Sequence, residues 1–227
     1  MTTPRPGDLV KDGSSLPADM ASLVRLSAAL AVGVPAEVEA ELRRAALDAE
    51  PRQVDEAILQ SCLFLGFPAA LEAAAAWRDI RGSAPSDEDP LAPAARAADR
   101  AKRGERLCRI VYGSAYEALR RNVAEANPAL DRLMVETGYG TVLARPGLQP
   151  AGRELCLVAV LAVQARDRQL YSHLRGALRT GASPEWVEAA LEIGLARAPE
   201  AARHRLRGLW NALRERRDVS ERNADVR

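Results

Sequence analysis

Apolar residues recur every three or four positions along most of the chain, which is the spacing of an amphipathic helix. Leu23, Leu26 and Leu30 are one example, in a segment that ends at Gly33. Prolines and glycines stand at most of the expected helix ends. The pattern predicts helices at about 17–33, 35–47, 53–65, 68–80, 94–112, 114–125, 128–138, 153–164, 167–180, 183–196 and 199–217.

Four segments lack this pattern. They are predicted to be an N-terminal arm (1–16), a proline-rich linker (83–93), an irregular loop (138–152) and a polar tail (218–227). The linker separates a first helical unit, residues 17–82, from a second one, residues 94–217.

The composition agrees with a helical protein. The chain is rich in Ala, Leu and Arg, which favour helices, and it has only 2 Phe, 3 Trp and 4 Tyr. β-Branched and aromatic residues are what strands prefer, so an all-β fold or a large sheet is excluded. The expected fold class is all-α.

Charge and cysteine content limit the partners and the compartment. The formal net charge of +1 gives no field that would attract nucleic acid or an anionic membrane. The first 15 residues have no apolar core of a signal peptide. The three cysteines are far apart and form neither a CxxC motif nor a zinc pattern, so we expect a cytoplasmic protein without a bound metal.

The two units resemble each other when the chain is shifted by 132 residues. Residues 23–32 then align with 155–164, and residues 41–47 align with 173–179. The alignment has no gaps, although similarity between any two Ala- and Leu-rich helices is the competing explanation. We interpret it as an internal duplication of a helical unit.

Several ordered motifs resemble the carboxymuconolactone decarboxylase family, which includes the AhpD alkylhydroperoxidases. They are RPGL at 145–148, RELCLVAVLAVQ at 153–164, HLRGAL at 173–178 and SPE at 183–185, with EAILQSCLFLGFPAALEA at 56–73 in the first unit. The resemblance covers about residues 20–80 and 95–213. It implies an AhpD-like helical bundle that assembles as a homo-oligomer, a trimer or hexamer, with sites near subunit contacts.

The AhpD-type site resembles E-x11-C-x2-C-x3-H, a redox cysteine pair served by a Glu–His relay. Glu154 and His173 have the required spacing, but Arg166 and Gln169 stand where the cysteines should be. Without a thiolate there is no nucleophile for a peroxide, so thiol peroxidase chemistry by the family's route is not expected. It would survive only through an unusual use of another cysteine, Cys108 or Cys156.

The remaining Glu–His pair is a competent general acid/base, because the carboxylate orients the imidazole. Decarboxylase-like members of the family also lack the cysteine pair, so the resemblance implies lyase chemistry, without a cofactor, on a small carboxylate or lactone. These members usually read WSRPGL where this chain has LARPGL at 143–148. The candidate catalytic residues are Glu154 and His173, and the candidate substrate-binding residues are Arg145, Arg166, Arg175, Tyr139 and Tyr171.

Two alternatives remain open. A single histidine in an amphipathic helix is more often a structural or surface residue than a catalyst, and only the spacing from Glu154 makes the two roles equal for His173. The chain could also be a non-catalytic ligand-binding or oligomeric interaction protein. The first unit supports this second interpretation. Its positions equivalent to Glu154 and His173 are Ser22 and Glu41, so no acid/base pair is expected there.

Overall fold

The computed structural model describes residues 16–82 and 97–225, and this part of the chain is helical without any strand, as the composition predicts. The predicted arm lies outside the described residues except for its last position, and the predicted linker lies outside them entirely. The helices are α1 (Ala18–Val32), α2 (Pro35–Asp48), α3 (Pro51–Arg81), α4 (Ala97–Tyr112), the short 3-10 turn η1 (Gly113–Ala115), α5 (Tyr116–Ala126), α6 (Pro128–Leu133), the π-helical η2 (Met134–Leu143), α7 (Pro150–Val163), α8 (Asp167–Arg179), α9 (Pro184–Arg197) and α10 (Glu200–Asp225).

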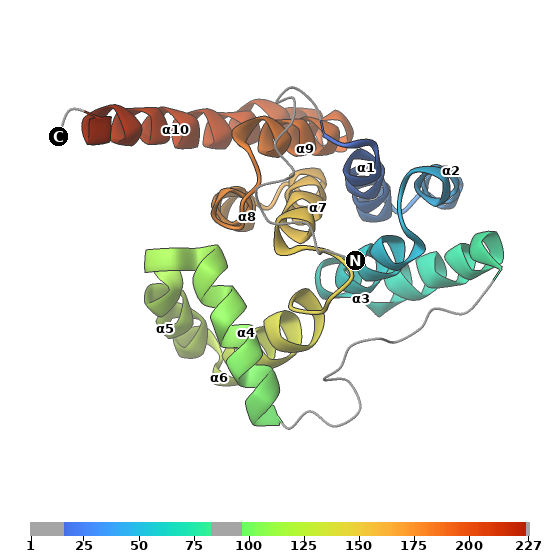
Figure 1. The fold of residues 1–227 in the computed structure, drawn as a ribbon, viewed down its shortest axis with the longest axis horizontal. Coiled ribbons are helices and arrows are strands. Elements are labelled where there is room, and N and C mark those ends of the chain that lie inside the picture. The colour runs from blue at the N-terminus through green and yellow to red at the C-terminus, as the bar shows by residue number, and fades with distance from the viewer. Residues whose placement is uncertain (1–15, 83–96, 226–227) are drawn as a thin grey trace, which may run out of the picture.

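Helix α7 lies at the centre of the bundle (Figure 1). Every residue from Gly152 to Val163 is buried, and α1, α8 and α9 pack around this helix. α10 lies across α8 and α9, while α4 packs against η2 and α8. A helix that is apolar almost all round is expected in the middle of a core, so the position of α7 follows from its sequence.

The two predicted units share one hydrophobic core, because α1 from the first unit packs directly on α7 from the second. Their helix starts coincide under the shift of 132 residues. Ala18 corresponds to Pro150 and Pro35 to Asp167, and Pro51 differs from Pro184 by one residue more. A duplication would produce this coincidence. The duplication itself stays a prediction.

The predicted loop at 138–152 is wrong over much of its length. Residues up to Leu143 continue a helix with wide π-type turns, and α7 begins at Pro150. Glycines misled the prediction, because Gly140 permits a close crossing with α4 and does not mark a turn. A Cβ on Gly140 would lie 2.2 Å from the Arg100 carbonyl oxygen, and one on Gly104 would lie 2.0 Å from that of Val135.

A bend in α3 and the end of α10 are two further features that the sequence pattern addressed. α3 bends sharply at Gly66, which has φ 83° and ψ 169°, so the two helices predicted on either side of this glycine are confirmed as the two arms of α3. α10 continues to Asp225, beyond the predicted end at 217. The sequence after Gly208 contains neither glycine nor proline, so no residue there ends the helix.

Candidate functional site

Glu154 and His173 form a buried hydrogen-bonded pair between α7 and α8. Nδ1 of His173 lies 2.8 Å from Oε2 of Glu154, and the two residues are 4% and 3% exposed. An ionised carboxylate only accepts hydrogen bonds, so beside such a carboxylate Nδ1 is the donor and Nε2 is the ring nitrogen left for another partner. The structure thus brings together the two residues that their spacing in the sequence singled out.

Gly176 makes room for the Glu154 carboxylate. It lies one helical turn after His173, and a Cβ at this position would stand 2.4 Å from Oε2 of Glu154 and 2.8 Å from a methyl carbon of Val111. The carboxylate therefore packs against the bare backbone of α8. This role was not predicted from the sequence, where Gly176 looked like any other small helical residue.

Aromatic rings from two other elements flank the imidazole, and a third ring packs against one of them. Phe64 of α3 meets His173 edge-on with ring centroids 5.7 Å apart, and Tyr112 of α4 does so at 6.5 Å. Tyr139 of η2 packs against Tyr112 at 6.1 Å. Of these three residues only Tyr139 was a candidate from the sequence.

Both tyrosine hydroxyls stay protonated in this environment. Burial raises the pKa of Tyr112 to about 12, and burial together with nearby Tyr112 and Glu154 raises the pKa of Tyr139 well above its ordinary value. The Tyr139 hydroxyl is enclosed, and its nearest polar neighbour is the Tyr112 hydroxyl, which affects its pKa but does not reach good hydrogen-bond geometry in the described residues. It is a buried donor that a ligand oxygen could satisfy.

The buried cysteines do not provide a thiolate at neutral pH. Burial raises the pKa of Cys108 to about 12, with Glu154 adding to the effect, and it raises that of Cys156 to about 11. Cys62 is half-buried. The described residues also hold no cluster of three His, Cys, Asp or Glu that could bind a metal ion. The raised thiol pKa values argue against a peroxidase that would use Cys108 or Cys156.

The other candidates on α8 do not join the pair. Arg166 is exposed directly before the helix. The Arg175 guanidinium lies over the Tyr171 ring at 5.8 Å, and the Tyr171 hydroxyl accepts a hydrogen bond from Arg216 of α10 at 3.4 Å. Residues two positions from His173 on a helix project about 200° away from it, so Tyr171 and Arg175 face the other side of α8.

Arg145 belongs to an ion-pair network beside the central helix. Its Nε donates to Glu56 Oε1 of α3 at 3.0 Å, and Arg153 donates to Glu56 Oε2 at 2.8 Å. Arg153 also donates to the backbone carbonyls of Arg145 and Leu148. The network ties the loop before α7 to α3. It also fixes the side chain of Arg153, the residue directly before Glu154.

The equivalent place in the first unit contains ion pairs in place of an acid/base pair. Ser22 donates to Asp48 and accepts from Arg25, whose Nε lies 3.7 Å from Glu41. Arg197 of α9 also donates to Glu41, at 3.3 Å. These contacts link α2 to α9 and agree with a structural role.

Residues 128–211, which contain the Glu154–His173 pair and η2, match the model of the carboxymuconolactone decarboxylase family. The all-α fold described above agrees with this match, so residues 128–211 are similar to this family. One relative is "Peroxisomal protein 2" of the fission yeast Schizosaccharomyces pombe (strain 972 / ATCC 24843), which is 31% identical over 143 residues. The match covers 62% of this chain and 66% of the relative, just under two thirds of the relative's own length.

Proposed function

We propose that Glu154 and His173 form a general acid/base that acts on a small carbonyl compound without a cofactor. The observation that carries the proposal is the 2.8 Å bond between His173 Nδ1 and Glu154 Oε2 inside an aromatic enclosure. Glu154 fixes the ring and stabilises the imidazolium, and Nε2 exchanges the proton with the substrate. Both residues lie within the segment that matches the decarboxylase family.

The surroundings of the pair favour a lactone or a small carboxylic acid with an adjacent carbonyl. His173 Nε2 would remove a proton from the carbon next to the carbonyl, and the electron pair would move onto the carbonyl oxygen. Tyr139 and Tyr112, whose pKa values are raised, would donate hydrogen bonds to that oxygen. In a decarboxylation His173 would start as the imidazolium: the C–C bond would supply the electron pair, CO2 would leave, and the imidazolium would protonate the carbon and regain its proton from solvent.

Access to the pair would require a side-chain movement. His173 is buried, whereas Phe64 and Tyr112 beside it are half-buried and form the part of the aromatic wall nearest to solvent. The enclosure is therefore expected to admit only a small substrate.

Hydrogen–deuterium exchange tests the proposal without knowledge of the complete reaction. A panel of small lactones and keto acids is incubated with the protein in D2O, and deuterium at the carbon next to the carbonyl is measured by NMR. We expect exchange with the wild-type protein and a fall of about 10²-fold or more in His173→Gln, since a positioned acid/base contributes that much. Equal exchange with both proteins would refute the proposal.

A non-catalytic ligand-binding function is the second candidate. The observation that favours it is that Tyr171 and Arg175 face away from the pair, while Arg145 is bonded to Glu56. A binding protein would be stabilised by a ligand but would catalyse no exchange with any compound of the panel. Homo-oligomeric assembly and a cytoplasmic location stay predictions, and "peroxisomal" describes the fission yeast relative.

A further inference from the structure

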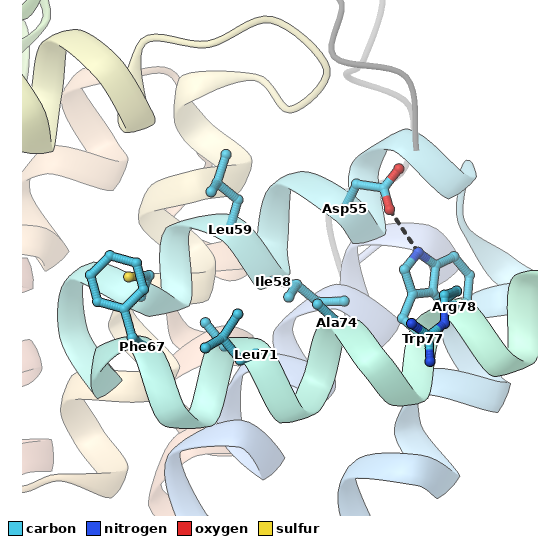
Figure 2. Close-up of a pocket in the computed structure, with 10 residues that line it drawn as sticks. Asp55, Ile58, Leu59, Phe67, Leu71, Ala74, Trp77 and Arg78 are labelled. Atoms are coloured by element: carbon cyan, nitrogen blue, oxygen red, sulfur yellow. Dashed lines mark hydrogen bonds between the residues drawn. The ribbon is translucent and has the colours of Figure 1, made fainter. Parts of the chain in front are cut away.

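The sharp bend in α3 is held at both ends of the hairpin, and it determines where Phe64 lies. Gly66 at the bend has φ 83°, a backbone conformation that favours glycine. Beyond the bend the second arm returns beside the first, and Trp77 Nε1 donates to Asp55 Oδ1 at 2.8 Å near the other end (Figure 2). Arg81 of the second arm also pairs with Asp55. The residues just before the bend therefore have a defined place in the bundle.

The backbone carbonyl of Phe64 has no partner within its own helix. In a continuous helix it would accept from the N–H four residues later, but that residue is Pro68, which has no N–H. Gln164, at the end of α7, donates its Nε2 to this carbonyl at 3.2 Å. A backbone carbonyl shielded from water is costly when it is unsatisfied. The Gln164 amide therefore satisfies the carbonyl that the bend leaves over, and it ties Phe64 to the central helix.

Phe64 forms the side of the aromatic enclosure that can move most easily. Its ring meets the imidazole of His173 edge-on, with ring centroids 5.7 Å apart, and the residue is half-buried. A phenyl ring has neither a donor nor an acceptor, so its displacement breaks no hydrogen bond. The backbone stays in place during such a movement, because Gln164 holds the carbonyl and not the ring.

Tyr112, the other ring beside His173, is held from two directions. Its ring packs against that of Tyr139 with centroids 6.1 Å apart, and burial raises the pKa of its hydroxyl to about 12. Arg179 of α8 donates to the backbone carbonyls of Val111 and Tyr112 at 3.1 and 2.9 Å. A cation at a helix C-terminus stabilises the last carbonyls, so the end of α4 is fastened to the helix that carries His173. The α4 side of the enclosure is closed more firmly than the α3 side.

We propose that Phe64 is the gate of the enclosure and that its ring limits the size of the compounds that reach Nε2 of His173. Gln164 is a positioning residue, because it acts through the backbone of Phe64. The limit on substrate size rests on the acid/base function proposed above, whereas the route to the imidazole is a property of the fold. The first unit, where no acid/base pair is found, thereby contributes the gate to the pair of the second unit.

Carbethoxylation by diethyl pyrocarbonate tests the route without any substrate. The reagent acylates a neutral imidazole nitrogen, and the chain has only 2 histidines, so exposed His204 on α10 is an internal reference for buried His173. By mass spectrometry we expect His173 to react far more slowly than His204 in the wild type, and about tenfold faster or more in Phe64→Ala, because a local opening is no longer required. Phe67→Ala is the matched control and should behave as the wild type, because Phe67 is 71% exposed and lines the cleft between the two arms of α3 (Figure 2).

A second variant and a second label separate the gate from general loss of structure. Gln164→Met removes the donor to the Phe64 carbonyl at nearly unchanged size, and it should speed the reaction of His173 by a smaller factor. Cys108 is 0% exposed and should stay unreactive toward a maleimide in both variants under the same conditions. If His173 gains reactivity only together with Cys108, the whole fold opens and the gate is refuted.

The size limit is tested in the exchange assay with lactones and keto acids of increasing bulk. Phe64→Ala should exchange deuterium into compounds too large for the wild type, whereas Phe67→Ala should keep the wild-type range. A wild type that exchanges no compound refutes the acid/base function, and the labelling of His173 then still decides the gate. Equal labelling of both histidines in the wild type would overturn the gate, as would a gain in Tyr112→Ala but not in Phe64→Ala.

Discussion

Replacing Gly176 by alanine tests how the functional pair is built into α8. In an exposed helix this substitution is favourable by about 1 kcal/mol, because alanine is the better helix former. At this position the new Cβ would lie 2.4 Å from Glu154 Oε2 and 2.8 Å from a Val111 methyl carbon, well inside van der Waals contact. The carboxylate must therefore move away from its place beside His173.

The net effect can be estimated from the contacts that change. Overpacking a buried site costs about 1–3 kcal/mol. Weakening a buried hydrogen bond to a charged group costs about 1.5–3 kcal/mol, and the gain in helix propensity offsets about 1 kcal/mol. We expect Gly176→Ala to lower the free energy of unfolding by about 3 kcal/mol, which corresponds to a Tm lower by roughly 6–12 °C for a chain of this size.

Urea unfolding and imidazole NMR measure the two consequences. Gly208→Ala is the control, because no atom lies within 4 Å of its added Cβ, and it should raise stability by about 0.5–1 kcal/mol. In Gly176→Ala the Nδ1 proton of His173 should lose the downfield shift of a hydrogen bond to carboxylate. If Gly176→Ala is as stable as Gly208→Ala and keeps this signal, the described packing of the pair is incorrect.

Three further predictions concern buried groups. Burial raises the pKa of Cys108 to about 12, that of Cys156 to about 11 and that of Tyr112 to about 12, so the folded state holds protons that the unfolded chain releases. Stability should therefore fall from about pH 9 upward, with the part that Tyr112 contributes beginning near pH 10. Urea midpoints between pH 8 and 11.5 should show this fall, and a smaller one in Tyr112→Phe; a flat profile would contradict it. Cys108, with a pKa of about 12, should resist maleimide at pH 8 until the protein is unfolded, as mass spectrometry of the labelled chain would reveal. Arg153→Met leaves the buried Glu56 with one fewer partner and should cost about 3 kcal/mol in urea unfolding, whereas a loss below about 1 kcal/mol would be inconsistent with the network.

The helical pattern predicts most of the fold because this chain follows local rules. Pro35 and Pro184 open the first turns of α2 and α9, and Gly33 caps the end of α1, almost where the sequence places these helix ends. The loop predicted at 138–152 is wrong because of packing between helices distant in the sequence. Gly104 and Gly140 are required where α4 crosses η2, and no local pattern distinguishes such a packing glycine from a turn glycine.

The candidate site was only partly predictable. Glu154 and His173 were recognisable because their spacing resembles a family motif. Both residues of this motif lie on two helices that are adjacent in the chain. Phe64, Tyr112 and Gly176 carry no such motif, since they meet the pair only after α3, α4 and α8 have packed. That Tyr171 and Arg175 face away from His173, in contrast, follows from the helical period alone.

The central claim is that the Glu154–His173 pair receives a small carbonyl ligand. The most direct measurement is a thermal-shift screen of small carboxylic acids and lactones on the wild-type protein and on His173→Gln, with Gly208→Ala as a control for altered stability. At 100 times its Kd a ligand adds about 2.7 kcal/mol of stability, so a clear rise in Tm is measurable. We predict that at least one compound raises the Tm of the wild type and of Gly208→Ala but not that of His173→Gln. Equal shifts in all three proteins, or no shift with any compound, would contradict the claim.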